Sequence, residues 1–118
     1  YIDGLVETGI VAIIKGEKEN DATIAIRADM DALPISETNE VPYCSKIPGV
    51  MHACGHDVHT TSLLGAIYIL NNTRPYWGGT TRFIFQPGEE LLPGGAKQMI
   101  EAGALGYPLP NAIIALHV

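Results

Sequence analysis

The 118-residue chain has few cysteines, few basic residues and no long apolar run. Its two cysteines, Cys44 and Cys54, are too few for a disulfide framework, although one bridge between them is possible. Seven Lys and Arg stand against 13 Asp and Glu, so the net charge is −6 and the pI is near 5.0. Because the basic residues are also scattered, we expect neither nucleic acid nor a membrane surface as a partner.

The chain has room for one domain at most. Its hydrophobic content of 47% supplies the material for a core. The sequence begins at Tyr1 rather than Met and ends at Val118 within an apolar run, so we expect it to be part of a longer protein. It shows no signal peptide and no apolar run long enough to span a bilayer, and we expect a cytoplasmic location.

The pattern predicts an α/β fold. Four segments have the composition of strands: residues 10–15, 22–28, 80–86 and 112–118. Helices are expected over residues 58–70, with Asp57 as N-cap, and over residues 94–102, followed by Gly103. The first two strands are expected to form a hairpin, and residues 80–118 a right-handed βαβ unit, which predicts a mixed, mostly parallel sheet with flanking helices.

Burial and loops can also be predicted from composition. The segment 112–118 is apolar at nearly every position, which predicts a strand buried on both faces. The helix at 58–70 is apolar on most faces, so we expect it to be buried, with another backbone close to Gly65. Residues 35–55 contain prolines and glycines and are expected to form a long irregular loop.

Residues 49–59 have the highest density of metal-binding atoms, with three histidines, one cysteine and one aspartate. Cys54 and His56 are two residues apart, so in an extended segment their side chains face the same side. Cys54 also precedes the predicted helix, and both a helix N-terminus and a metal lower the pKa of a thiol.

Other candidate ligands follow three of the predicted strands: Asp29 and Asp31 the second, Glu89 and Glu90 the third, and His117 at the end of the fourth. Open α/β sheets bind ligands at the carboxyl ends of their strands, so we expect these groups to meet Cys54 and His56 at one rim. Taken singly, each has an ordinary explanation as a turn, a solvated carboxylate or a strand-end histidine. The functional signal lies in the set.

Such a cleft would be strongly negative. Four of its groups carry negative charge when ionised: Asp31, Cys54, Glu89 and Glu90. Like charges at close range raise one another's pKa or require cations, and two divalent ions would balance them. Carboxylates, imidazoles and one thiolate suit zinc, manganese, cobalt or nickel, whereas magnesium and calcium prefer all-oxygen sites.

Four motifs occur in order along the chain: Arg-Ala-Asp-Met-Asp-Ala-Leu-Pro at 27–34, Met-His-Ala-Cys-Gly-His-Asp-Val-His-Thr at 51–60, Phe-Gln-Pro-Gly-Glu-Glu at 85–90 and Leu-His-Val at 116–118. Together they resemble the amidohydrolases of the aminoacylase and carboxypeptidase superfamily, which include hippurate hydrolase, N-acyl-amino-acid amidohydrolases and auxin-conjugate hydrolases. The resemblance implies a zinc-peptidase-like catalytic domain that hydrolyses N-acyl amino acids of the hippurate type with two divalent ions, zinc or manganese. It also implies a homodimer for the full-length protein.

The resemblance implies a role for each matching residue. Cys54 would bridge two metals where relatives use an aspartate, and the further ligands would be His56, Glu90 and His117. Glu89 would be the general base.

Asp31 matches the aspartate that relatives place beside a metal-ligand histidine, so the resemblance implies a catalytic role in which Asp31 orients a ligand. At the position of that histidine this sequence has Asp29, so the role of the histidine as a metal ligand does not transfer to it. His52 and His59 have no assigned role. Residues 1–118 would be one part of a catalytic domain whose lid or dimerisation domain and closing segment lie outside this chain.

Three other functions fit parts of the pattern. Cys54 could be the nucleophile of a thiol hydrolase with a histidine as base. The chain could be a metal-binding module without turnover. It could also belong to a dipeptidase or carboxypeptidase of the same superfamily and act on dipeptides.

Overall fold

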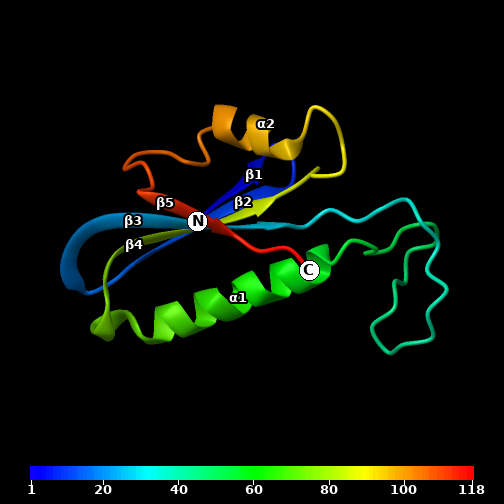
Figure 1. The fold of residues 1–118 in the computed structure, drawn as a ribbon, viewed down its shortest axis with the longest axis horizontal. Coiled ribbons are helices and arrows are strands. Elements are labelled where there is room, and N and C mark those ends of the chain that lie inside the picture. Colours follow the sequence, from blue (N-terminus) through cyan, green and yellow to red (C-terminus); the bar gives the residue numbers. More distant parts are fainter.

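The computed structural model describes residues 1–118 and has a five-stranded sheet with one helix on each face (Figure 1). The elements are β1 (Ile2–Leu5), β2 (Gly9–Lys15), β3 (Lys18–Asp29), α1 (His56–Asn72), the 3₁₀ turn η1 (Arg74–Tyr76), β4 (Gly78–Gln86), α2 (Gly95–Glu101) and β5 (Ala112–Ala115). The strand order is β1-β2-β4-β3-β5, and the mixed α/β fold expected from the sequence is confirmed. No helix is long and apolar enough to cross a membrane.

The predicted hairpin of β2 and β3 is wrong, because β4 lies between these two strands. β4 pairs antiparallel with β2, where Val11 faces Ile84, and parallel with β3, where Ala28 faces Phe85. Parallel neighbours need a crossover, which α1 provides between β3 and β4. β4 and β5 both run parallel to β3 and flank it, with α2 between them in sequence.

The core has two parts, one on each face of β4. Successive side chains of a strand point to opposite faces. Ile84 packs with Met99 under α2, whereas Phe83 and Phe85 pack with Leu63 under α1. β4 is therefore the buried centre of the sheet, and its carboxyl end is held in a fixed place.

The helix predicted at 58–70 is confirmed, but it begins at His56. Gly55 occupies the N-cap position with a left-handed φ of 74°, and this conformation, which glycine adopts without strain, turns the chain into the helix early. The prediction of Asp57 as N-cap is therefore wrong. Asp57 lies in the first turn, where a carboxylate interacts favourably with the helix dipole.

The expected burial of α1 is wrong for most of its length. Leu63 is buried against the sheet, whereas Leu64 and Ile69 are more than half exposed, and no atom lies within 4 Å of a Cβ built on Gly65. The helix touches the sheet with one stripe only, so its other faces remain uncovered.

The expected double-sided burial of residues 112–118 is also wrong. β5 pairs with β3 alone and forms the edge of the sheet, and its residues are exposed. The strand ends at Ala115, so His117 follows the strand instead of ending it.

The loop at 35–55 is irregular, as predicted. Its one regular contact is an isolated bridge between Leu33 and Met51. Cys44 and Cys54 both lie in this loop as free cysteines, so the structure has no disulfide between them.

Candidate metal centre

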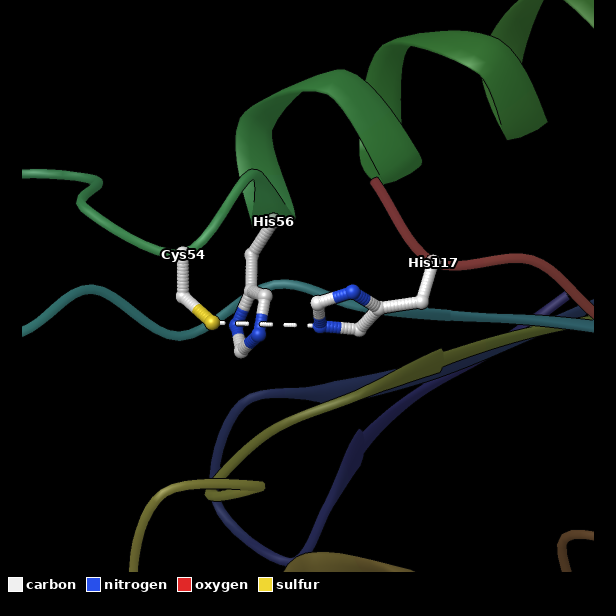
Figure 2. Close-up of side chains that lie close together, drawn as sticks. All are labelled: Cys54, His56 and His117. Atoms are coloured by element: carbon white, nitrogen blue, oxygen red, sulfur yellow. Dashed lines mark hydrogen bonds between the residues drawn. The ribbon is translucent and has the colours of Figure 1, made fainter.

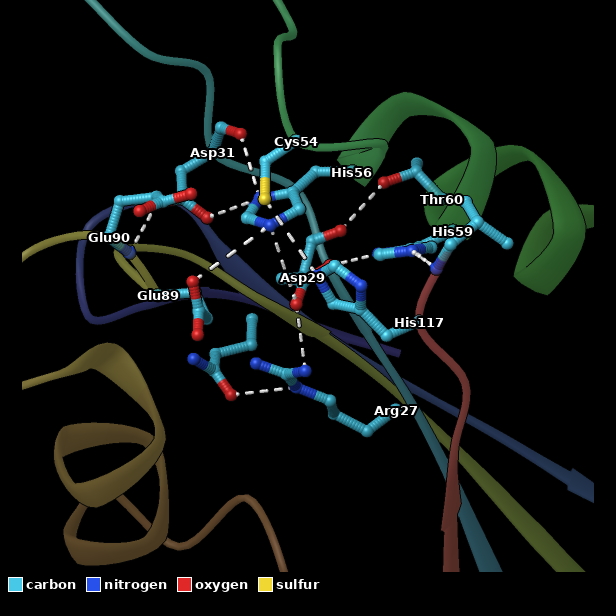
Figure 3. Close-up of polar contacts among 12 residues, drawn as sticks. Arg27, Asp29, Asp31, Cys54, His56, His59, Thr60, Glu89, Glu90 and His117 are labelled. Carbon is cyan, nitrogen blue, oxygen red and sulfur yellow. Dashed lines mark hydrogen bonds and ion pairs between the residues drawn. The ribbon is translucent and has the colours of Figure 1, made fainter.

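Four separate segments meet at the carboxyl ends of β3, β4 and β5, beside the first turn of α1 (Figure 3). The structure brings together all six residues singled out as ligands, base or orienting group: Asp31, Cys54, His56, Glu89, Glu90 and His117. The rim expected from the sequence is thus present in the fold.

His56 lies at the centre of this cluster and is 1% exposed. Its Nδ1 lies 3.0 Å from the backbone oxygen of Asp31 and 3.1 Å from the Oδ1 of the same residue. Both partners are acceptors, so Nδ1 carries a proton, and in the neutral ring Nε2 is then the nitrogen with a lone pair. The Nε2 atom is buried and has no hydrogen-bond partner. Buried polar atoms are nearly always paired, so this lone pair fits a cation.

Cys54 and His117 supply a thiol and an imidazole next to His56. The Sγ of Cys54 lies 3.8 Å from the Nε2 of His117, and the ligand atoms of the three residues lie within 4.8 Å of one another (Figure 2). One thiolate and two imidazoles are a donor set that suits zinc and related transition metals.

Glu89 and Glu90 add carboxylates to His56 in a second group of ligand atoms within 4.8 Å. The Oε2 of Glu89 lies 3.9 Å from the Nε2 of His56, and the Glu89 side chain is 42% exposed. The backbone N–H of Glu90 donates to the Oδ2 of Asp31 over 3.0 Å. Asp31 therefore connects His56 to the loop that carries both glutamates.

Hydrogen bonds set the charge of Asp31. Burial raises its pKa, but backbone N–H donation from Glu90 and Glu89 outweighs burial and leaves the pKa below its ordinary value. Asp31 is thus ionised at neutral pH and can accept the proton of His56 Nδ1.

The thiol of Cys54 behaves differently from the prediction. Its hydrogen bond with Glu90 raises its pKa, and burial and the charges of Glu90, Glu89 and Asp29 add to this effect. The lowering expected from the helix N-terminus is therefore wrong for the protein alone, because the carboxylates outweigh it. A cation beside the sulfur would favour the thiolate again.

Asp29 and His59 form a buried pair below the predicted ligands. Asp29 is 1% exposed, its Oδ1 lies 2.5 Å from the Nδ1 of His59, and Arg27 lies 2.8 Å from its Oδ2. The Oδ2 atom has no aligned hydrogen-bond donor, so the contact with Arg27 is ionic. Burial raises the pKa of Asp29, but the hydrogen bond with His59 and the charge of Arg27 outweigh it and lower the pKa.

Sequence reasoning assigned no role to this pair. The spacing of His56 and His59 could have indicated that His59 lies near the site, because residues three apart share one face of a helix. Their rings do lie close, with centroids 5.5 Å apart, and Asp29, His56 and His59 form a third group of ligand atoms within 4.8 Å. His52 is exposed and belongs to none of the three groups.

A cavity of about 870 Å³ opens beside Asp31 and Glu90. Much of its lining is apolar: Leu33, Pro34, Val50, Leu91 and Leu92. It therefore offers an apolar surface next to the charged cluster.

Comparison with known proteins gives a consistent result. The family model described as peptidase family M20/M25/M40 matches residues 25–118. The chain is 50% identical over 111 residues to N-acetylcysteine deacetylase of Bacillus subtilis (strain 168), covering 94% of this chain and 28% of that protein. It is 52% identical over 99 residues to thermostable carboxypeptidase 2 of Saccharolobus solfataricus (strain ATCC 35092 / DSM 1617 / JCM 11322 / P2), covering 83% of this chain and 25% of that protein.

A solved structure has the same fold. The Bacillus subtilis YXEP protein, described as a dinuclear metal binding peptidase from the M20 family, superposes with a TM-score of 0.88 at 48% identity. The match covers 99% of this chain and 32% of that chain. The chain thus spans between a quarter and a third of the length of these relatives.

Proposed function

Because this chain belongs to peptidase family M20/M25/M40, we propose that it carries part of the metal centre of a hydrolase that cleaves the amide bond of N-acyl amino acids. The observation that carries this proposal is the buried, unpartnered Nε2 of His56, which lies among a thiol, an imidazole and two carboxylates. A site of this composition is built for cations rather than for a hydrophobic core.

The residues that would hold the ions are Cys54, His56, Glu90 and His117. The resemblance of this chain to a dinuclear metal-binding peptidase supports two divalent ions, and the mixed sulfur, nitrogen and oxygen donors favour zinc or manganese, with cobalt or nickel as substitutes. When bound, such ions polarise an amide carbonyl and lower the pKa of water toward about 7.

Glu89 is proposed as the general base. Its side chain is 42% exposed and reaches the site without a hydrogen bond that would fix it. It can therefore take a proton from the attacking water and deliver it to the leaving nitrogen. The backbone of the loop that carries Glu89 and Glu90 is held by Asp31, which also fixes the ring of His56.

The substrate class follows from the cavity and from the relatives. The apolar lining beside Asp31 and Glu90 suits an acyl group, and one relative is named as a deacetylase of an N-acyl amino acid. Hippurate-type substrates belong to this class. The second candidate is a dipeptidase or carboxypeptidase activity, which the name of the Saccharolobus relative favours. A homodimer of the full-length protein is part of the same proposal.

Replacement of the base tests the mechanism. In the full-length protein, Glu89→Gln is expected to lower the rate of hippurate hydrolysis by about 10²–10⁴-fold while the bound metal stays at the wild-type ratio. The matched control Glu90→Gln lies one residue away and should lose metal as well as turnover. Near-normal turnover of Glu89→Gln would show that another group is the base.

Two further measurements separate the alternatives. Hydrolysis that survives chelation but stops on alkylation of Cys54 would indicate a thiol hydrolase instead. Faster cleavage of dipeptides than of N-acyl amino acids would favour the peptidase activity.

A further inference from the structure

Both ring nitrogens of His59 are occupied by hydrogen bonds. Its Nδ1 lies 2.5 Å from the Oδ1 of Asp29, and its Nε2 lies 3.0 Å from the backbone nitrogen of Val118. A backbone N–H can only donate, so Nε2 must be the acceptor. Nδ1 then carries the hydrogen, which it donates to the Asp29 carboxylate. His59 is therefore the neutral Nδ1–H tautomer.

This arrangement leaves no nitrogen of His59 for a cation. Asp29, His56 and His59 lie close enough to form a ligand group, but His59 has no free lone pair in this hydrogen-bond pattern. His56 sits on the same helix with its Nε2 unpaired. The two buried histidines thus differ: His56 has a nitrogen free for a cation, and His59 does not.

The acceptor atom of His59 acts on the segment that carries His117. Val118 follows His117 directly, so the hydrogen bond fixes the peptide unit between them. Sheet pairing ends at Ala115, and Leu116 and Val118 are 76% and 72% exposed, so packing restrains this segment little.

Two further distances show that the segment lies close to α1. The ring centroids of His59 and His117 lie 4.8 Å apart, and a Cβ added to Gly55 would lie 3.0 Å from the carbonyl oxygen of Val118. The segment therefore crosses the first turn of the helix at close range, with His59 as its hydrogen-bond anchor (Figure 3).

We propose that His59 is a positioning residue that holds the His117 imidazole within reach of Cys54 and His56, and that it is not itself a metal ligand. This inference rests on the proposed metal centre. Asp29, paired with Arg27, fixes the tautomer of His59, in the way that carboxylates behind histidines do in metal sites.

Two amide substitutions separate the two hydrogen bonds of His59. In His59→Asn the amide can still donate to Asp29 but does not reach Val118. In His59→Gln the longer side chain places an amide oxygen where Nε2 was, so it can accept the Val118 N–H. Titration of the full chain with cobalt(II) against a competing chelator measures metal affinity, and thermal unfolding shows whether each variant is folded.

We expect His59→Asn to weaken cobalt binding by about 10–100-fold, and His59→Gln to stay within about threefold of the wild type. Loss of one bound ion in both variants would overturn the inference, because it would make His59 a ligand. Wild-type affinity in both variants would overturn it too. A wild-type chain that binds no cobalt would instead contradict the proposed function itself.

The tautomer gives a readout that does not depend on metal. In ¹⁵N NMR spectra of the metal-free chain, the Nδ1 of His59 should be protonated and Nε2 should not. A protonated Nε2, in either the other neutral tautomer or the imidazolium, would remove the acceptor for Val118 and overturn the inference.

Discussion

The carboxylate of Asp29 is buried below the candidate metal centre, and its neighbours hold it in the charged form. His59 hydrogen-bonds to one oxygen, and Arg27 forms an ion pair with the other. A buried charge without such partners would be strongly destabilising, so these contacts are needed for Asp29 to occupy this place. The single residue thus links the fold of β3 to the geometry of the site.

The lowered pKa values of Asp29 and Asp31 predict acid sensitivity. A carboxyl group with a folded-state pKa below its unfolded value of about 3.8 contributes stability above that value and loses it as the pH falls through the folded-state pKa. We expect the free energy of unfolding of the metal-free chain to fall below about pH 4. Urea denaturation across this range measures it.

Asp29→Asn should flatten this dependence on pH, because the amide does not titrate. The control Asp21→Asn changes an exposed carboxylate far from the site and should leave the slope as in the wild type. An unchanged slope in Asp29→Asn would mean that other groups cause the acid sensitivity.

Most of the candidate site could be predicted from the chemistry of its side chains. The hydrogen bond between the Val118 backbone and His59 could not. Cys54, His56 and His117 stand out in the sequence because few residue types bind metals. The bond from Val118 to His59 uses a backbone N–H, which every residue except proline has. No sequence pattern marks such a donor, so only the fold reveals it.

At the scale of elements, α1 and α2 each contain a glycine whose surroundings differ. A Cβ on Gly65 in α1 would meet nothing within 4 Å, whereas a Cβ on Gly95 at the start of α2 would lie 1.6 Å from the carbonyl oxygen of Pro87. The first glycine is tolerated in its helix, and the second is required for α2 to lie against the end of β4.

We therefore expect opposite effects from the same substitution. Gly65→Ala should stabilise the chain by about 0.5–1 kcal/mol, because alanine is the better helix former. Gly95→Ala should destabilise it by about 1–3 kcal/mol through overpacking. Urea denaturation of both variants checks the signs. A neutral Gly95→Ala would mean that the loop after Pro87 adjusts freely.

The positions of helices and strands in the sequence were easier to predict than the pairing of the strands in the sheet. The apolar run at 58–70 gave α1, although its N-cap was wrong, and the glycines that flank 95–102 gave α2, since these signals lie within one or two turns of each helix. The pairing of β2 with β4 depends on a strand more than 60 residues away, and nothing local excludes the hairpin with β3. In the same way, the composition of β5 gave a strand but not its place at the edge.

At the scale of the whole molecule, much apolar surface is uncovered. The outer edge of β5 is unpaired, with Ile113 and Ile114 54% and 47% exposed, and α1 adds further apolar side chains. An exposed apolar edge strand is a site for pairing with another chain. The 118-residue chain should therefore self-associate at high concentration.

Ile113→Lys should weaken this self-association by roughly tenfold or more, since it removes an apolar side chain and adds charge at the edge. Sedimentation velocity over a concentration series measures the effect. Tyr107→Lys is the control, because Tyr107 is 96% exposed and lies outside the sheet. Equal weakening by both variants would show that charge alone, rather than the edge, is responsible.

The residues that meet at the site come from distant parts of the chain, and Cys54 and His117 are 63 residues apart. An ion held by both would act as a removable cross-link that closes a long loop. By the chain-entropy relation used for disulfides, a loop of this length corresponds to about 4 kcal/mol. Metal loading would then follow the docking of β5, since His117 lies just beyond that strand. Metal starvation would weaken the fold as well as the chemistry.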